Sequence, residues 1–368
     1  MGFTIKDAST GISIGSDEEV TIRDCYITDT NYPIEAYADN DINLFNITLG
    51  LNGLQAVKMN GETIGYSNSS ITRTWNINNL TVNPEGDLNV RSTNNTGTAT
   101  LKVVGNAELA FNEGKNIIVG GADYNKRGAL SATGVTFTAL DTSLGWDGIY
   151  FSDYSDDGSS LIDSCIIEYA DDGIYCASAS PTITNSTIRS NTDGIYADSG
   201  SQPTITGNTF TGNERPVFIY VDRIQSNIYG NTYSGNTKDY IEVQNATLDE
   251  NLTYVWSMDG APYLISSDLE VRRDNNSSQL STLKIDSGAT VMFKNGVDLY
   301  IGHGSNSNYR GALIANGVTF TAFDSTGWNG IRFRNYADDG SCLIDSSIIE
   351  GADDGIRALP VTWIFDHT

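Results

Sequence analysis

Aromatic side chains return in the central part of the sequence at nearly constant spacing, each directly behind an apolar residue. These aromatic residues are Tyr150, Tyr175, Tyr196 and Phe218. Successive side chains of a β-strand point to opposite faces, so an inward apolar residue turns the following ring toward solvent. A row of exposed rings suits the C–H faces of pyranose sugars and predicts carbohydrate binding. The alternative is that the rings only stabilise an exposed sheet surface by cross-strand packing.

Acidic residues lie in the same segments as these rings. We name Asp172, Asp193 and Asp198 as candidate sugar-binding residues, because carboxylates at strand ends can accept hydrogen bonds from sugar hydroxyls. The neighbouring acidic residues are Asp147, Asp153, Asp156, Asp157 and Asp171. Asp-Asp-Gly is also ordinary turn chemistry that keeps a long protein soluble, and its return at 338–340 and 353–355 without tyrosines favours that interpretation.

Calcium is an open alternative for these carboxylates, since it takes six to eight oxygen ligands. The sequence contains no EF-hand loop and no glycine-aspartate nonapeptide. We therefore predict no cofactor and no metal site, and leave calcium binding open.

The elements that must position these side chains are short strands that repeat about every 22 residues. Residues 181–184 (Pro-Thr-Ile-Thr) return as residues 203–206, and Gly11-Ile12 is followed by Pro33-Ile34. One repeat is too short to bury its apolar face alone, whereas stacked coils bury it. The sequence therefore predicts an all-β fold, a parallel β-helix of on the order of 16 coils.

Two stacked columns follow from this spacing. We expect a core column that comprises Ile166, Ile188, Phe210 and Tyr233. We expect a polar ladder at a turn that comprises Ser186, Asn208 and Asn231.

A second and longer repeat divides the chain. Residues 127–138 return as residues 310–321, and Trp146 is matched by Trp328. We predict one continuous β-helix over residues 1–368, built of two tandem copies of about 182 residues, roughly 1–183 and 184–360, with an atypical tail over 361–368. Because Arg332 and Arg357 replace Tyr150 and Tyr175 in the second copy, the aromatic row belongs to the first.

Charge and composition exclude several classes of partner. The 46 acidic residues exceed the 21 Lys and Arg, which gives a formal net charge of −25. This balance argues against binding to nucleic acid or to an anionic membrane. No run of about 18 apolar residues exists, so we predict no membrane insertion. Cys25, Cys165, Cys176 and Cys342 stand at no metal-ligand spacing, and we interpret them as buried fillers, with a Cys165–Cys176 disulfide left open.

Residues 148–151, 166–170 and 181–188 resemble the right-handed β-helix repeats of the pectin-lyase-like superfamily. They look most like those of bacterial extracellular surface and carbohydrate-associated proteins. The resemblance covers nearly the whole chain up to about residue 359. It implies a right-handed helix of about 22 residues per coil, a secreted or surface location, a polysaccharide partner and a larger multidomain or repeat protein.

Enzymes of this superfamily carry motifs that can be tested here. Polygalacturonase-like hydrolases combine Asn-Thr-Asp, Asp-Asp one coil later and Gly-His-Gly beyond. Residues 191–193 and 302–304 match the first and the last of these motifs, but about five coils separate them. Residues 363–367 come near the Trp-x-Asp-His motif of pectate-lyase-like enzymes, with one residue too many. We therefore name no catalytic residue and lean against an enzyme.

Three hypotheses about function remain open. The first is a non-catalytic, extracellular carbohydrate-binding module for a plant-cell-wall polysaccharide such as xylan, which uses the aromatic row. The second is a polysaccharide lyase or glycoside hydrolase with acidic residues in a shallow groove. The third is a structural spacer or adhesin stalk, which tandem copies would suit.

Overall fold

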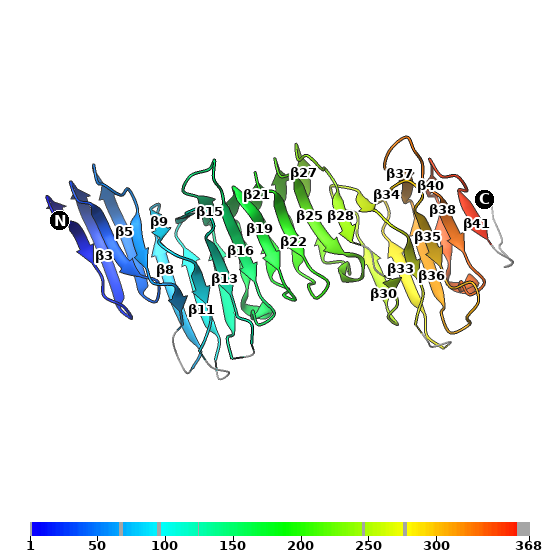
Figure 1. Ribbon diagram of the computed structural model, residues 1–368, viewed down its shortest axis with the longest axis horizontal. Coiled ribbons are helices and arrows are strands. Elements are labelled where there is room, and N and C mark those ends of the chain that lie inside the picture. Colours follow the sequence, from blue (N-terminus) through cyan, green and yellow to red (C-terminus); the bar gives the residue numbers. More distant parts are fainter. Residues whose placement is uncertain are drawn as a thin grey trace. The chain divides into compact units, whose positions relative to one another are not determined.

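The structure, a computed structural model, describes residues 2–358 except 66–68, 94–96, 124, 245–246 and 275–277 (Figure 1). Over these residues the chain is an all-β parallel solenoid of about 14 turns. The predicted fold class is confirmed, although the mean turn is about 25 residues long because many connecting loops are longer than expected. The predicted tail, with the motif at 363–367, lies outside the described residues.

Contacts between residues divide the chain into two compact units. The first comprises Met1–Pro216 and Ser234–Thr237, and the second comprises Val217–Tyr233 and Lys238–Thr368. Strand β25 (Arg215–Tyr220) contains the point of division. The limits of the two tandem sequence copies are a separate matter, and they stay a prediction.

The first unit has three parallel sheets, in which each strand pairs with the strands of neighbouring turns. The first sheet contains β1 (Phe3–Lys6), β3 (Glu19–Thr28), β5 (Asp41–Leu49), β8 (Ile71–Ile77), β11 (Ala99–Val104), β14 (Gly128–Thr133), β17 (Leu161–Asp163), β20 (Thr182–Thr184) and β23 (Thr204–Thr206). The second contains β2 (Thr10–Ser13), β4 (Tyr32–Tyr37), β6 (Val57–Asn60), β9 (Thr81–Pro84), β12 (Glu108–Phe111), β15 (Thr136–Ala139), β18 (Ile166–Glu168), β21 (Thr187–Arg189) and β24 (Thr209–Thr211). The third contains β7 (Thr63–Ile64), β10 (Leu88–Val90), β13 (Asn116–Val119), β16 (Trp146–Phe151), β19 (Ala170–Cys176) and β22 (Asp193–Ala197).

The second unit repeats this plan. One row contains β28 (Ile241–Gln244), β31 (Tyr263–Ile265), β34 (Thr290–Phe293), β37 (Thr319–Ala322) and β40 (Ile348–Ile349). Another contains β29 (Thr247–Leu248), β32 (Leu269–Val271), β35 (Asp298–Ile301), β38 (Gly330–Phe333) and β41 (Ile356–Ala358), and a third contains β30 (Thr253–Trp256), β33 (Ser281–Ile285), β36 (Gly311–Asn316) and β39 (Leu343–Asp345). The remaining elements are β26 (Ile228–Tyr229), β27 (Thr232–Ser234) and the short 3₁₀ helices η1 (Asp157–Ser159), η2 (Val221–Arg223) and η3 (Asp339–Ser341).

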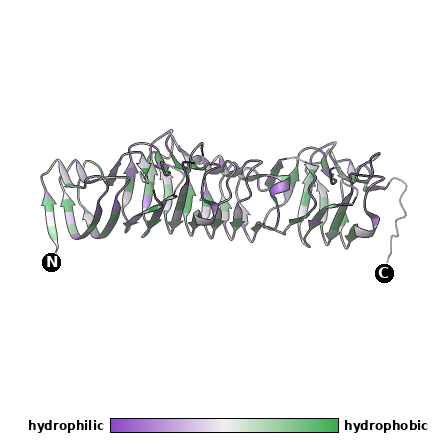
Figure 2. Ribbon diagram, turned by 90° about the horizontal axis from the view of Figure 1, so that it is seen from below, coloured by the Kyte–Doolittle hydropathy of each residue, from purple (hydrophilic) through white to green (hydrophobic). Residues whose placement is uncertain are grey.

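Apolar columns inside the turns explain why these residues form strands. On the third sheet of the first unit, Ile117, Ile149, Ile174 and Ile195 stack in register and are all buried. Burial of one such side chain contributes about 1.5–3 kcal/mol, and the β-branched residues suit a pleated surface. The strands of both units carry hydrophobic residues (green in Figure 2). The core therefore fixes which residues of each strand point outward.

One predicted column is displaced by a single residue. Ile167, and not Ile166, pairs with Ile188, which pairs in turn with Phe210. Ile166 is only half-buried. The prediction is wrong because this turn is one residue shorter than its neighbour, and a slip of one residue moves a side chain to the other face. Tyr233 belongs to the second unit.

The predicted polar ladder is confirmed within the first unit. The amide of Cys165 donates to Ser186 Oγ at 3.0 Å, and the amide of Ser186 donates to Asn208 Oδ1 at 2.9 Å. Asn231 lies in the second unit, where its amide donates to Asp259 Oδ1 at 2.8 Å. Such side chains satisfy buried backbone groups at the turns.

The two sequence copies share structural details as well as residues. Trp146 stacks on Phe111 with ring centroids 4.6 Å apart, and Trp328 stacks on Phe293 at 4.1 Å. Each indole Nε1 donates to a backbone carbonyl at 2.9 Å, that of Glu168 in one copy and that of its counterpart in the other. The long repeat therefore preserves core geometry.

All four cysteines are free, and Cys25, Cys165 and Cys176 are buried as expected of filling residues. Burial raises the pKa of the Cys165 thiol to about 11, so it is an unreactive group. Among the described residues, no helix has the length and apolar character needed to cross a membrane.

Candidate functional site

The third sheet of the first unit carries a vertical row of tyrosines. Tyr150 pairs with Tyr175, which pairs with Tyr196, on the adjacent strands β16, β19 and β22. The residues on either side of Tyr175, Ile174 and Cys176, are fully buried, so alternation turns the ring outward as predicted. Tyr150 is 36 % exposed and the other two rings are half-buried. We call these three residues the tyrosine row.

The rings of the tyrosine row overlap instead of lying in one plane. The centroids of Tyr150 and Tyr175 are 5.2 Å apart with planes 13° from parallel, and those of Tyr175 and Tyr196 are 4.8 Å apart at 5°. Coplanar rings at this spacing would collide, so neighbouring rings stack nearly parallel to each other. Each ring therefore covers part of the face of its neighbour, and the surface of the row is not flat.

Phe218 does not extend this surface as an exposed ring, and that expectation is wrong. The side chain is only 6 % exposed and belongs to the second unit. Its ring packs edge-on against Tyr220, with centroids 6.1 Å apart. Val217 and Ile219 beside it are also buried, so β25 is apolar on both faces and alternation does not expose Phe218.

A bulge beside the tyrosine row positions an acidic group. The pairing of β16 with β19 shifts after Gly148, which lies opposite Asp172, whereas Ile149 lies opposite Ile174. Gly148 has φ 106°, and a Cβ at this position would come within 1.6 Å of the Asp172 carbonyl oxygen. Only glycine fits this close approach.

Asp172 and Asp193 are neighbours in register on β19 and β22. Burial and then the charge and hydrogen bond of Asp193 raise the pKa of Asp172 to about 7. Asp193 is itself buried and is held by Arg215, whose Nε donates to Oδ1 at 2.7 Å while Nη2 donates to Oδ2. The Arg215 guanidinium also lies 5.7 Å from the centroid of Tyr196, at the end of the row. Asp193 therefore holds Arg215 in place and helps to raise the pKa of Asp172.

A cleft of about 330 Å³ opens beside Tyr150 and Tyr175. The remaining lining residues are Asn116, Asp147, Ile149, Asp171 and Asp172. Burial and the charges of Asp171 and Asp87 raise the pKa of Asp147. The cleft thus joins exposed aromatic surface to three carboxyl groups.

Asn116 supplies an unused acceptor to this cleft. Its Oδ1 is buried and makes no hydrogen bond with any residue that the structure describes. A buried polar atom without a partner costs about 1–3 kcal/mol, which a hydroxyl donor from a ligand would recover. Sequence reasoning missed Asn116, although its position one turn before Gly148, the neighbour of Asp147, was available as a signal.

Asp198 has a structural task. Its Oδ1 accepts hydrogen bonds from the amides of Ser178 and Gly200, each at 2.9 Å, and from the Ser201 hydroxyl at 2.8 Å. These bonds close the turn after β22. A role of Asp198 in sugar binding stays a prediction.

The remaining polar motifs hold local turns. His303 Nδ1 accepts from the amides of Ser305 at 3.2 Å and Asn306 at 3.1 Å. Within the described ranges, no group of three or more His, Cys, Asp or Glu residues is arranged to hold a metal ion. Calcium binding stays open as a prediction.

Comparison with known proteins agrees with this architecture. Residues 120–256 match the family described as "Right handed beta helix region". Over this segment the chain is similar to right-handed β-helix proteins. The β-helix is consistent with the pectin-lyase-like superfamily that the sequence resembles. The comparisons with curated proteins and with solved structures gave no match to the β-helix chain.

Proposed function

We propose that the protein is a non-catalytic polysaccharide-binding β-helix that works outside the cell or on its surface, as part of a larger protein. The β-helix fold alone hosts enzymes, adhesins and binding modules, so the proposal rests on the site. The observation that carries it is the stacked row Tyr150, Tyr175 and Tyr196 beside a cleft with unused polar groups.

The spacing of the tyrosine row supports an extended glycan as ligand. Rings advance by one strand, about 4.8 Å, per turn of the helix. This step is close to the length of one pyranose residue, so successive sugars can each meet one ring. The carboxyl groups of Asp147 and Asp171 disfavour an anionic chain. We therefore propose a neutral plant-cell-wall polysaccharide such as xylan.

Affinity electrophoresis and calorimetry with xylan, a neutral glucan and polygalacturonate test the proposal. Tyr175→Ala removes the middle ring, and we expect at least a tenfold loss of affinity, which corresponds to about 1.4 kcal/mol. Tyr196→Ala should weaken binding less, since that ring lies at the end of the row. Tyr37→Ala is the matched control, because Tyr37 is 41 % exposed elsewhere in the first unit. Binding that survives both row variants contradicts the proposal, and no binding to any glycan favours a structural spacer.

Catalysis is the second candidate, and one observation favours it. Asp172, with its pKa raised to about 7, and Asp147, also raised, line the same cleft. A carboxyl group that holds its proton near neutrality can serve as a general acid in glycoside cleavage. An assay of reducing ends and unsaturated products on the bound glycan decides between the candidates. Turnover that Asp172→Asn abolishes would establish the enzyme.

A further inference from the structure

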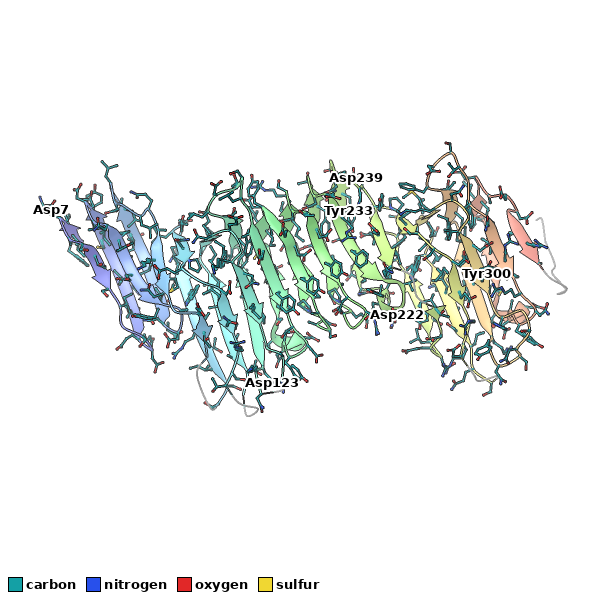
Figure 3. The ribbon with its side chains drawn as sticks, viewed as in Figure 1. Asp7, Asp123, Asp222, Tyr233, Asp239 and Tyr300 are labelled. Atoms are coloured by element: carbon teal, nitrogen blue, oxygen red, sulfur yellow. The ribbon has the colours of Figure 1, made fainter. Side chains whose placement is uncertain are left out.

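The second unit carries a pocket lined by basic residues, whereas the cleft of the first unit is lined by acidic ones. The pocket has a volume of about 250 Å³ and is lined by Tyr300, Arg332, Phe333, Arg334 and Arg357. Three of these five residues are arginines and none is acidic, in a chain whose formal net charge is −25. Tyr300 is labelled over the strands of this unit in Figure 3. We propose that this pocket binds an oxyanion.

Strand register brings the cationic groups together. Tyr300 on β35 pairs with Arg332 on β38, which pairs with Arg357 on β41. Arg334 stands two residues beyond Arg332, so alternation places both on the same face. Its guanidinium lies 3.5 Å from the centroid of Tyr300, which fixes it at the pocket wall.

Two carboxylates, one buried and one half-buried, hold two of the arginines without using all the N–H donors of these arginines. Arg332 Nε donates to Asp298, which is 4 % exposed and also accepts from the Tyr300 hydroxyl at 2.8 Å. Arg334 Nη1 donates to Glu270 Oε1 at 3.0 Å. The terminal nitrogens of Arg332 make no hydrogen bond among the residues that the structure describes. An arginine carries five N–H donors, so both remain able to bind a ligand.

Among the three arginines of the pocket, Arg357 makes the longest ion pair. Its Nη1 lies 3.8 Å from Asp354 Oδ2, beyond hydrogen-bond distance, and its side chain is 55 % exposed. A guanidinium binds carboxylate, sulfate or phosphate oxygens through two parallel N–H groups. Arg332 and Arg334 therefore offer the pocket N–H donors that are already held in place. The exposed guanidinium of Arg357 can move to form two parallel hydrogen bonds with the anion.

Calorimetry at constant ionic strength tests the oxyanion site with sulfate, glucose 6-sulfate and glucose as probes. We expect saturable binding of sulfate, weakened at least tenfold by Arg357→Gln and less by Arg357→Lys, which keeps the charge but loses the fork. Lys284→Gln removes the same charge from β33, where Lys284 is 46 % exposed, and should change affinity less than twofold. The urea midpoint of each variant confirms that it folds.

The three probes separate the two sources of the anion. Equal affinity for sulfate and glucose 6-sulfate indicates a free ion, whereas tighter binding of the sugar sulfate indicates an anion carried on a glycan. Sulfate binding that chloride reproduces, or that Arg357→Gln leaves unchanged, overturns the proposal. The test does not use Tyr175→Ala or Tyr196→Ala, so its result is independent of whether the first unit binds a glycan.

Discussion

Equivalent strand positions carry tyrosines in the first unit and arginines in the second. Tyr150 and Tyr175 correspond to Arg332 and Arg357, while the stacked tryptophans and their carbonyl bonds are the same in both. Inward residues set the path of the coil, so they are constrained by packing. Outward residues make few core contacts and can change their chemistry without changing the fold. One repeat can therefore present two surfaces of different chemistry.

The polar residue beneath the tyrosines is neutral, whereas the equivalent residue beneath the arginines is charged. Asn116, at the position equivalent to Asp298, keeps a carbonyl oxygen at the cleft of the first unit that no described residue hydrogen-bonds. Asp298 carries the charge that Arg332 needs and also accepts from Asn329 at 2.8 Å. A buried charge is tolerated only with a partner, and Arg332 is that partner of Asp298.

Backbone strain shared by the two copies should give the strongest response to mutation. Gly148 and Gly330 have φ of 106° and 120°, and a Cβ would meet a carbonyl oxygen at 1.6 and 1.7 Å. We expect Gly148→Ala and Gly330→Ala each to lower the free energy of unfolding by about 3 kcal/mol. Urea unfolding measures the loss. Gly114→Ala and Gly296→Ala are matched controls, since no atom of the described residues lies within 4 Å of a Cβ added there, and each should cost about 1 kcal/mol. Equal losses in all four variants would show that the close approach is not the cause.

Exchanging Asp298 for Asn and Asn116 for Asp, at the two equivalent positions beneath the outward residues, tests whether the buried charge and the outward arginine depend on each other. Asp298→Asn should destabilise the protein by about 2 kcal/mol, because Arg332 loses its buried counter-ion. Asn116→Asp adds a carboxylate where Tyr150 stands in place of an arginine, and we expect a loss of about 1 kcal/mol that shrinks at low pH as the group is protonated. Denaturation at pH 5 and pH 8 measures both. A stabilising Asn116→Asp would refute the proposed coupling.

The tryptophans should respond alike in the two units. Trp146→Phe and Trp328→Phe keep a stacked ring but leave a carbonyl, buried in the first copy and part-buried in the second, without its indole donor. We expect each to cost about 1–2 kcal/mol, with the two values within about 0.5 kcal/mol of each other. Thermal or urea unfolding supplies the comparison. A large difference between the two variants would show that the copies are not equivalent in the core.

A weaker effect is the pH dependence of stability that Asp172 contributes in the first unit. The Asp172 carboxyl ionises near its ordinary pKa when unfolded, but burial and Asp193 hold the folded pKa at about 7. The unfolded chain therefore binds fewer protons, and stability falls as pH rises from about 4 to 7. Asp172→Asn removes this fall, so the variant should gain about 1 kcal/mol relative to the parent between pH 4.5 and pH 8. A difference that stays constant over this range contradicts the raised pKa.

The sequence was sufficient to predict the β-helix and the tyrosine row, because a repeat combined with strand alternation determines both the stacking and the outward face. The prediction fails where local length or two-sided burial overrides the period. The period places Ile166 in the core, but its turn is one residue short, and alternation places Phe218 on the surface, although β25 is apolar on both faces.

The polar groups and the bulge beside the tyrosine row were not predicted. Arg215 follows Asp193 by one turn, and this register alone is enough to suggest the ion pair. The bulge at Gly148 and the unpaired side-chain oxygen of Asn116 are set by the three-dimensional fold, since no sequence pattern states which glycine has a positive φ or which amide oxygen makes no hydrogen bond with a described residue.

A crystal structure of the protein with a neutral β-linked xylo-oligosaccharide and sulfate would show whether the two copies bind different ligands. We expect sugar rings over Tyr150, Tyr175 and Tyr196 with a hydroxyl at Asn116 Oδ1, and sulfate between Arg332 and Arg357. An oligosaccharide that leaves the tyrosines uncovered, or one that occupies the arginine pocket while sulfate is excluded, would contradict the claim that outward residues give the two copies different ligands.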